Sequence, residues 1–237
     1  MTRRRWIADE VSGDRAALVG SHAQHLSLVL RARIGQNFDV VADGVLRCGR
    51  VSSISDDRVE FELGEKISTA AVPGVTLAIS IFKFDRLEWA IEKCTELGVA
   101  RIVPLIARRS ETHLVAAAKK RVERWRRIAH QASEQSRRVT PAEITAPMKL
   151  KDVVALPGAI RIVLAETEKN IMLKDALSSA PPGGDILLAF GPEGGWTEAE
   201  VESFRSFGWQ PASLGPTILR SETAVIAAAA IVLSELQ

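Results

Sequence analysis

The sequence contains no tyrosine, and its two cysteines, Cys48 and Cys94, lie far apart and form no C-x-x-C pair. The absence of tyrosine removes a phenolic acid, base or nucleophile from every mechanism open to the chain. The cysteine count argues against a disulfide framework and against a cysteine zinc site. His22 and His25 form an H-x-x-H pair with no third ligand nearby, so no metal is expected. These features fit a reducing, cytoplasmic setting.

Long apolar runs are also missing. The longest, Val75–Phe82 and Ala224–Leu233, fall well short of the roughly 20 residues that a membrane span needs, and the arginine-rich start has no apolar segment typical of a signal peptide. Apolar residues make up 46% of the 237 positions and charged residues 25%, which are ordinary values for a soluble protein. At about 150 residues per domain, this length predicts one large domain or two smaller ones.

Charge is distributed unevenly along the chain, although the net charge is only +2. Residues 101–140 hold eleven Lys or Arg and three acidic residues, a balance of +8. Residues 141–237 hold seven basic and twelve acidic residues, a balance of −5. A basic block of this kind is typical of a surface for a polyanion, but a solvated basic helix has the same composition, and charge alone leaves both interpretations open.

Residues 1–70 have the pattern of a β-rich domain. Asp43-Gly44 is a tight-turn dipeptide between the expected strands Phe38–Ala42 and Val45–Cys48. A second expected strand pair, Val51–Ile54 and 59–63, flanks Asp56-Asp57, and His22–Arg33 is the one stretch with helical spacing. Short strands joined by tight turns favour a small barrel or sandwich.

After Pro73-Gly74 the pattern changes, and apolar strands alternate with helices. Such alternation predicts a mostly parallel sheet that is covered on both faces. The last expected helix, Ser221–Leu236, is apolar nearly all round, so we expect it to be buried inside the domain or against a partner subunit. The expected strands are 75–82, 101–106, 160–165, 186–190 and 212–214, and the other expected helices are 85–97, 116–137 and 197–207.

Two loops that contain glycine and proline are the best candidates for a site. Residues 187–197 lead from a strand through Gly191, Gly194 and Gly195 into a helix with a capping box, and residues 214–223 follow the next strand. Glycines at a strand end let a ligand approach the backbone closely. A plain β–α turn would have the same residues, and neither loop matches a phosphate-binding G-x-x-x-x-G-K-[ST] or G-x-G-x-x-G motif. Ser221 is a candidate N-cap of the closing helix, with Glu222 in its first turn.

Almost the whole chain resembles the RsmE-type 16S ribosomal RNA uridine-N3 methyltransferases of the SPOUT superfamily. One position departs from the family pattern, because Thr217 stands where the family usually carries arginine. The matching motifs are His25-Leu26, Asp43-Gly44, Asp85-Arg86-Leu87-Glu88, 92–99, Arg109-Ser110, Arg124-Trp125, Glu134-Gln135-Ser136, 191–195, Leu214-Gly215, 218–220 and 222–224.

The resemblance implies an α/β protein with two domains: a PUA-like β-barrel that binds RNA in residues 1–72, and a SPOUT domain with a trefoil knot in residues 73–237. It also implies a homodimer, S-adenosylmethionine as cofactor, and 16S ribosomal RNA or the small ribosomal subunit as partner. The residues that would surround the cofactor are Leu164, Ala165, Gly191, Glu193, Gly194, Gly195, Leu214, Gly215, Ile218 and Leu219.

Transfer to uridine N3 requires the loss of a weakly acidic proton, so a cation beside the uracil oxygens would assist it. Arg220 is the candidate cation, and Glu193 or Glu222 the candidate proton acceptor. Trp6, Trp125, Trp196 or a phenylalanine could stack on a base. The alternatives are a methyltransferase for another RNA or base atom and a non-catalytic ribosome-assembly protein. The residues expected to contact RNA phosphates are Arg3, Arg4, Arg5, Arg31 and Arg33 in the barrel, and Arg124, Arg127 and Arg138 in the basic segment.

Overall fold

A computed structural model describes residues 5–67, 74–136, 138–178 and 184–236. The chain divides into two compact units, each described here by itself. The N-terminal unit comprises Met1–Ala71 and Glu134–Thr140, and the C-terminal unit comprises Val72–Ser133 and Pro141–Gln237. Within the described ranges, no helix combines the length and apolar character needed to cross a bilayer.

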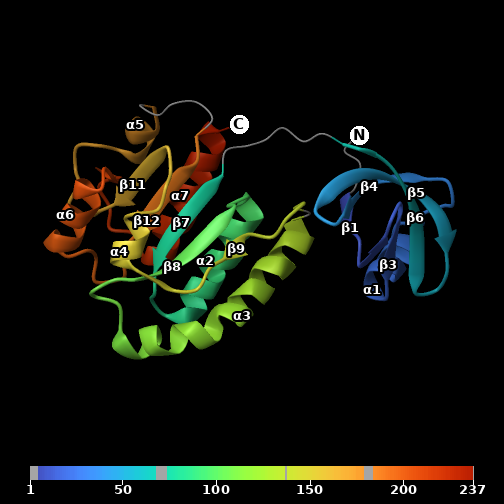
Figure 1. The fold of residues 1–237 in the computed structure, drawn as a ribbon, viewed down its shortest axis with the longest axis horizontal. Coiled ribbons are helices and arrows are strands. Elements are labelled where there is room, and N and C mark those ends of the chain that lie inside the picture. The colour runs from blue at the N-terminus through green and yellow to red at the C-terminus, as the bar shows by residue number, and fades with distance from the viewer. Residues whose placement is uncertain (1–4, 68–73, 137, 179–183, 237) are drawn as a thin grey trace. The chain divides into compact units, whose positions relative to one another are not determined.

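The N-terminal unit is a curved six-stranded sheet in the order β1-β4-β5-β6-β3-β2 (Figure 1). Its two outer strands, β1 and β2, are consecutive in the chain. Within residues 5–12 the chain pairs first with β4 and then with β3, at the opposite end of the sheet order. Ala8 N–H donates to the carbonyl of Val41, and Asp9 N–H donates to the carbonyl of Ala17, both at 2.9 Å. This change of partner closes the sheet on itself, as expected for a small barrel. The strands are β1 (Arg5–Ile7), β2 (Glu10–Ser12), β3 (Arg15–Val19), β4 (Asn37–Ala42), β5 (Val45–Ile54) and β6 (Arg58–Lys66).

The predicted tight turn is confirmed, because Asp43 and Gly44 have φ angles of 49° and 74° between the antiparallel strands β4 and β5. The two strands predicted at 45–48 and 51–54 are in fact one strand, β5, with register irregularities after Arg47 and Val51. Gly49 lies in its middle, where a Cβ would collide with the side chain of Val40. The glycine therefore allows β4 and β5 to pack closely and does not end a strand.

The helix predicted at 22–33 was wrong in length and type. It is a short α-helix, α1 (Ser21–Gln24), continued by a π-turn, η1 (His25–Val29). Leu26 packs in the barrel core, but Val29 is 65% exposed. In the wider π-turn, Val29 does not share the buried face of Leu26, and the chain leaves the helix at Arg31, which has a φ of 52°.

The C-terminal unit is built on a parallel sheet in the order β10-β8-β7-β12-β11-β13, with β9 also pairing with β8. The predicted mostly parallel sheet is therefore confirmed. Its strands are β7 (Val75–Ser80), β8 (Arg101–Ile106), β9 (Glu143–Ile144), β10 (Met148–Lys149), β11 (Ile160–Leu164), β12 (Ile186–Phe190) and β13 (Gln210–Ala212). Its helices are α2 (Phe84–Leu97), α3 (Thr112–Ser136), α4 (Leu150–Val153), α5 (Leu173–Ser178), α6 (Glu198–Ser206) and α7 (Ser221–Glu235).

Helices cover both faces of this sheet, as predicted (Figure 1). Residues on alternate positions of β7 and β12 enter two different cores, with Leu77 and Leu188 in one and Ala78 and Ala189 in the other. The larger core includes α2, α3, α5 and α7, and the smaller one contains residues of α4 and α6. Leu97, the last residue of α2, is 40% exposed.

The closing helix α7 is not buried all round. Val225, Ala229 and Val232 lie on its buried side, whereas Ile226 and Ile231 are only half-buried. Both isoleucines still pack against the core of a single copy, and the outer side of α7 exposes the small residues Thr223, Ala230 and Ser234.

Candidate functional site

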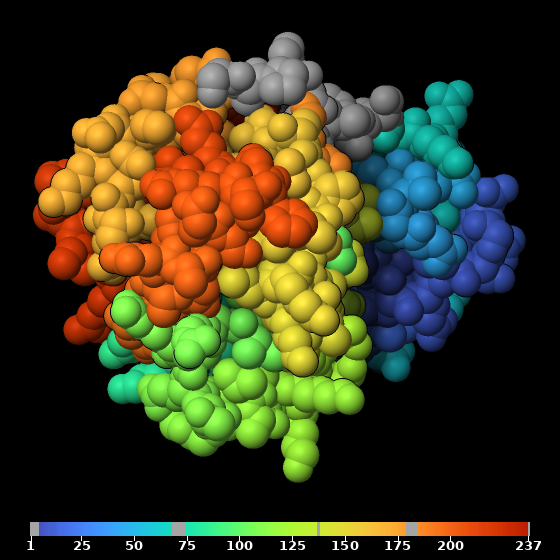
Figure 2. All heavy atoms as spheres, turned by 60° about the vertical axis from the view of Figure 1, so that its left-hand side comes forward, coloured from blue at the N-terminus to red at the C-terminus, as the bar shows by residue number. Residues whose placement is uncertain are grey.

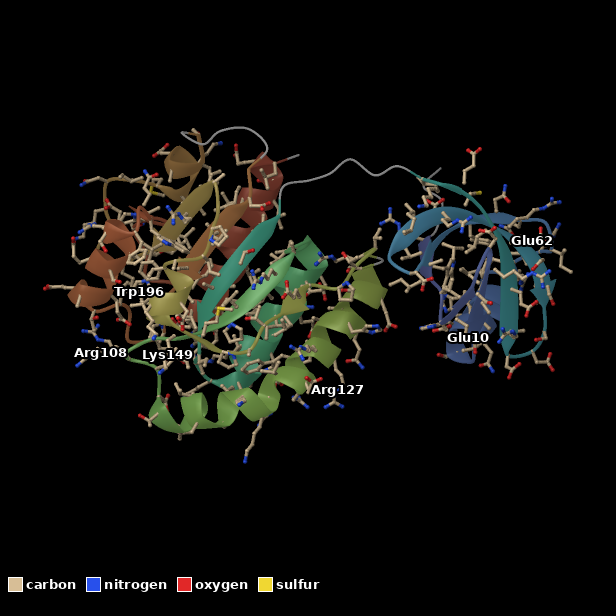
Figure 3. The ribbon with its side chains drawn as sticks, viewed as in Figure 1. Glu10, Glu62, Arg108, Arg127, Lys149 and Trp196 are labelled. Atoms are coloured by element: carbon tan, nitrogen blue, oxygen red, sulfur yellow. The ribbon has the colours of Figure 1, made fainter. Side chains whose placement is uncertain are left out.

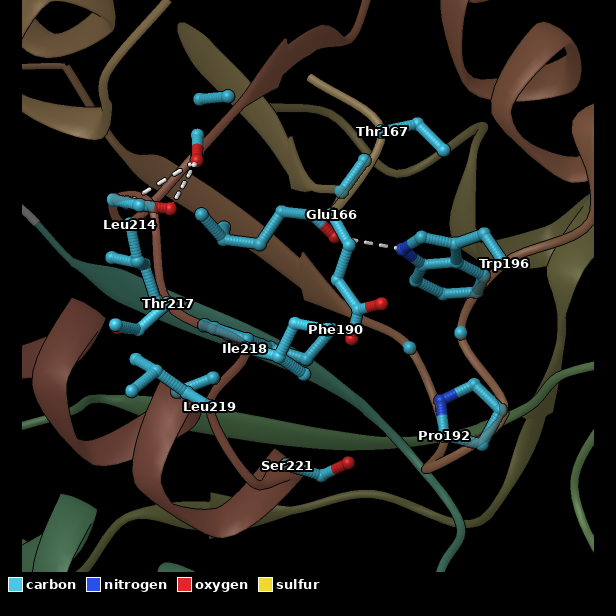
Figure 4. Close-up of a pocket in the computed structure, with 18 of the residues that line it drawn as sticks. Glu166, Thr167, Phe190, Pro192, Trp196, Leu214, Thr217, Ile218, Leu219 and Ser221 are labelled. Carbon is cyan, nitrogen blue, oxygen red and sulfur yellow. Dashed lines mark hydrogen bonds between the residues drawn. The ribbon is translucent and has the colours of Figure 1, made fainter. Parts of the chain in front are cut away.

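A cavity of about 230 Å³ lies at the carboxyl ends of β11, β12 and β13 (Figure 4). These ends are level, because Leu164 pairs with Phe190 on one side and with Ala212 on the other. The loops that follow the three strands are thus brought to one edge of the sheet, which is where open parallel sheets bind ligands. The cavity is lined by Arg109, residues 164–167, 190–192, 194–196, 212–219, Ser221 and Ala224.

The loop after β12 is held in a fixed shape. Gly195 has a φ of 68°, which a side chain rarely tolerates, and a Cβ on Gly191 would lie 3.4 Å from the indole of Trp196. The Trp196 Nε1–H donates to the carbonyl of Leu164 at 2.9 Å, so the indole connects this loop to the end of β11. The predicted capping box is present: the Thr197 side chain accepts from Glu200 N–H, and the Glu200 carboxylate accepts from Thr197 N–H.

The segment after β8 braces the same loop. The Arg109 guanidinium donates from Nη1 to the carbonyls of Gly194, at 2.7 Å, and Trp196, at 3.3 Å. The backbone N–H of Arg108 donates to the buried Glu200 carboxylate at 2.8 Å. Two residues far away in the sequence thus fix the position of the glycine loop.

The loop after β13 presents its backbone to the cavity. The Ser213 hydroxyl accepts from Gly215 N–H and donates to Gly215 O, both at 3.2 Å, and Gly215 has a φ of 129°. In the part of the chain that the structure describes, the N–H groups of Leu214, Ile218 and Leu219 have no hydrogen-bond acceptor. Ile218 is also 81% exposed. A ligand in the cavity would find unpaired donors and apolar side chains along this loop.

Nine of the ten residues predicted to surround the cofactor line this cavity: Leu164, Ala165, Gly191, Gly194, Gly195, Leu214, Gly215, Ile218 and Leu219. Glu193 belongs to the same loop but is exposed and is not among the lining residues. The structure therefore brings the two predicted loops together at one cavity. Their part in cofactor binding stays a prediction.

The three predicted catalytic side chains lie outside the lining set. Arg220 is exposed and is the N-cap residue of α7, so the prediction that Ser221 caps this helix was wrong. Ser221 is instead the first residue of α7 and lines the cavity. Glu222 is only 5% exposed, and its Oε1 lies 3.7 Å from Arg86 Nε. Its Oε2 has no hydrogen-bond partner in the described structure.

Two ionisable residues of the cavity were not among the predicted site residues. Among its described lining residues, Glu166 and Arg109 are the ionisable ones. The labelled side chain of Glu166 extends from the end of β11 into the cavity (Figure 4). Its position two residues after the end of β11 could have identified it, because Leu164 and Ala165 were already singled out there.

The residues predicted to contact RNA have different surroundings. Arg124 donates to both oxygens of Glu88 at 2.8 and 2.9 Å, and this pairing raises the pKa of Arg124. Arg127 is exposed on α3 (Figure 3), and Trp125 is fully buried, so the indole of Trp125 cannot stack on a base. Arg5 lies in β1, Arg31 and Arg33 are exposed, Arg138 is half-buried, and Arg3 and Arg4 lie outside the described residues.

A metal site is not formed by the described residues, which contain no group of three or more His, Cys, Asp or Glu placed to hold an ion. His22, one half of the H-x-x-H pair, instead places its Nδ1 2.9 Å from Asp9 Oδ1. That contact gives His22 a local structural partner.

Comparison with known proteins agrees with this arrangement. Residues 70–233 match the RNA methyltransferase domain family. The chain is 34% identical over 218 residues to ribosomal RNA small subunit methyltransferase E of Bacillus subtilis, covering 88% of this chain and 85% of that protein. It is 30% identical over 237 residues to the protein of the same name from Aquifex aeolicus, covering 97% and 98% of the two chains.

Solved structures extend the similarity to the fold. The ribosomal RNA small subunit methyltransferase E of Neisseria gonorrhoeae, bound to S-adenosyl methionine, superimposes with a TM-score of 0.76 at 28% identity, covering 99% of this chain and 98% of that chain. A methyltransferase from Legionella pneumophila with bound cofactor SAM gives 0.74 at 26% identity, with the same coverage. The chain therefore belongs to the RNA methyltransferase domain family and, within it, to the ribosomal RNA small subunit methyltransferase E proteins.

Proposed function

We propose that the protein transfers a methyl group from S-adenosylmethionine to N3 of a uridine in the 16S RNA of the small ribosomal subunit. The observation that carries the proposal is the cavity at the ends of three parallel strands, which both predicted glycine loops line. Two related structures of the same fold are described as holding S-adenosylmethionine. The names of the relatives supply the substrate class, small-subunit ribosomal RNA.

The lining of the cavity suits this cofactor. Apolar side chains such as Phe190, Leu214 and Ile218 offer surfaces for an adenine ring, and the unpaired N–H groups of the second loop offer donors to its nitrogens. The Glu166 carboxylate suits a ligand that carries positive charge. When bound, S-adenosylmethionine supplies a methyl group on a positively charged sulfur, which is an electrophile.

The residues of the chain must then make uracil N3 a nucleophile. Each unit by which the site lowers the pKa of N3–H corresponds to about 1.4 kcal/mol. Arg220, which follows the cavity-lining residue Leu219, would be the cation that stabilises negative charge on a uracil oxygen. Glu193, exposed on the glycine loop, is the better proton acceptor of the two predicted glutamates, because Glu222 is buried beside Arg86.

We further propose that two copies associate through the outer side of α7. Ile226 and Ile231 pack against the core but stay half-buried in a single copy, Ala230 is exposed, and a helix with apolar residues on nearly every side favours a second surface that covers it. Arg220 begins the same helix, so an interface along α7 would also lie next to the proposed catalytic arginine.

The remaining parts of the proposal concern architecture. The barrel would be PUA-like and would hold RNA through Arg5, Arg31 and Arg33, and the loops around β11–β13 would form a trefoil knot. The domains would be residues 1–72 and 73–237, and the protein would act in the cytoplasm, where small subunits are assembled.

The decisive experiment is methyl transfer to small ribosomal subunits isolated from a strain that lacks the enzyme, followed by mapping of the labelled base. We expect one labelled uridine that blocks reverse transcription, because a methyl group on N3 occupies the base-pairing edge. Label on another atom or another RNA would favour a different methyltransferase. Calorimetry that detects no uptake of S-adenosylmethionine would favour a non-catalytic assembly protein.

A further inference from the structure

The carboxyl edge of the parallel sheet carries a second feature beside the cavity. Lys149 ends β10 and pairs in register with Ile106, the last residue of β8, and Arg108 follows two residues later. Both cations are therefore at the same edge as Phe190 and Leu164, where the cavity opens, but on the other half of the sheet.

These two side chains carry free positive charge. Arg108 and Lys149 are exposed, and in the described ranges neither side chain makes an ion pair or hydrogen bond. Glu200, which accepts from the backbone N–H of Arg108, is itself buried and engaged with Thr197. By contrast, Arg121 and Arg124 of the basic helix α3 lie within 3.4 Å and 2.8 Å of Glu88.

The two cations and the glycine loop share one surface. Figure 3 labels Arg108, Lys149 and Trp196 at the same end of the C-terminal unit. Figure 2 shows the chain near residues 110, 150 and 200, in green, yellow and orange, meeting on one face. Arg109, next to Arg108, contacts the glycine loop directly through Gly194.

The spacing of the strands gives the distance between these two cations and the cavity at the end of β12. Neighbouring strands lie about 4.8 Å apart, so β8 is roughly 10 Å and β10 roughly 14 Å from β12 along the sheet. A nucleotide whose base entered the cavity would carry its neighbouring phosphates across this range. Two unpaired cations there would hold the strand by charge without reading its sequence.

We propose that Arg108 and Lys149 form a phosphate-binding surface that holds the RNA strand beside the target nucleotide. The inference rests on the proposed function, because it takes the cavity as the place of methyl transfer. It adds a positioning surface in the C-terminal unit to the arginines predicted in the barrel and on α3. Neither residue touches the reacting atoms, so both are positioning residues.

The test measures binding of the full-length protein to a fluorescein-labelled oligouridine RNA as a function of salt. Each phosphate contact to single-stranded nucleic acid contributes about 0.7 to the slope of log affinity against log salt. Replacing both residues, Arg108→Ala with Lys149→Ala, should therefore make the slope less steep by about 1.4. If the affinities of the two proteins converge at 1 M salt, the variant should bind the RNA roughly 25-fold more weakly at 0.1 M salt. Affinity for S-adenosylmethionine, measured by calorimetry, should stay unchanged.

Two control variants sharpen the test. Lys119→Ala with Lys120→Ala removes the same charge from exposed positions on α3 and should change the slope much less. Arg108→Lys with Lys149→Arg keeps both charges and should keep the slope. An unchanged slope in the Arg108→Ala, Lys149→Ala variant, or an equal loss in the α3 variant, would overturn the proposal.

Methyl transfer to small subunits separates this inference from the function on which it rests. If the wild-type protein methylates the subunits and the Arg108→Ala, Lys149→Ala variant keeps both slope and kcat/KM, the surface is refuted and the function stands. If the wild-type protein transfers no methyl group but the variant loses the slope, the surface binds RNA and the proposed function is refuted.

Discussion

At the scale of single residues, Glu166 gives a specific prediction for cofactor binding, because its carboxylate lines the cavity. If it faces the positively charged end of S-adenosylmethionine, Glu166→Gln should weaken binding of that cofactor by about 10- to 100-fold, as expected for a lost charged hydrogen bond. Binding of adenosine, which has no sulfonium and no ammonium group, should change little. Calorimetry with both ligands measures the difference.

Glu198→Gln provides a matched control on the exposed first turn of α6, outside the lining of the cavity. An equal loss of adenosine and cofactor binding in Glu166→Gln would instead assign the carboxylate to the ribose hydroxyls.

Arg220 is predicted to act in the reaction more than in cofactor binding, since it lies outside the lining of the cavity. Arg220→Ala should lower kcat by about 100-fold or more, the usual cost of removing a group that stabilises a developing anion. Its affinity for S-adenosylmethionine should fall by much less. Single-turnover kinetics together with calorimetry separate the two effects, and an unchanged turnover rate would remove Arg220 from the mechanism.

Cys94 gives a prediction for alkaline pH. Burial raises the pKa of its thiol to about 12 from an ordinary value of 9.0. Below pH 9 the thiol is protonated in both states and contributes no pH dependence; between pH 9 and 12 only the unfolded chain releases the proton, so stability falls as pH rises. The contribution is about 1.4 kcal/mol per pH unit within that window.

Denaturant titrations of wild type and Cys94→Ala between pH 8 and 11 test this prediction. The difference between the two free energies of unfolding should shrink as pH rises, and tyrosine, absent from the chain, cannot obscure it. A constant difference would mean that the Cys94 thiol ionises equally in both states.

At the scale of elements, the sequence predicted most of the sheet and helices that position the site, but it could not predict elements that depend on long-range packing. The parallel strands 101–106 and 186–190 have the predicted bounds because each is an apolar run between turn residues. The short strands β9 and β10 have two residues each, too few for any periodicity. Gly49 was compatible with a break between strands, and only contact with Val40 reveals its packing role.

The brace between the β8 loop and the glycine loop gives a prediction for an element. Arg109→Ala removes the donors to Gly194 and Trp196, so the loop at 191–197 should open more often. We expect faster hydrogen–deuterium exchange in that loop and about 10-fold weaker binding of S-adenosylmethionine.

Arg205→Ala is a suitable comparison, because Arg205 makes an exposed contact of 3.9 Å with Glu202 in the nearby helix α6. If exchange in the loop at 191–197 stays at the wild-type rate in Arg109→Ala, the capping box and the Trp196 contact suffice to fix the loop.

At the scale of the whole molecule, alternation of strands and helices predicted a parallel sheet, but the lateral order of its strands was not predictable. Alternation says that each strand is followed by a crossover, and it does not say on which side the next strand is added. The +8 charge of residues 101–140 likewise overstated the free charge, because Glu88, which lies outside this stretch, engages Arg121 and Arg124. Three-dimensional contacts decide which cations remain available for RNA.

The proposed interface on α7 gives a prediction for the oligomeric state of the protein. If two copies associate there, sedimentation should give about 52 kDa, twice the chain mass of 25.8 kDa. Ile231→Glu should shift the mass toward that of one chain, because a carboxylate would have to be buried at the interface without a partner. Leu28→Glu, at an apolar side chain of the barrel that is 70% exposed, introduces the same charge and should leave the mass unchanged. A wild-type protein that sediments as one chain at micromolar concentration would contradict association through α7, and Arg220 would then have to act beside the cavity of its own chain.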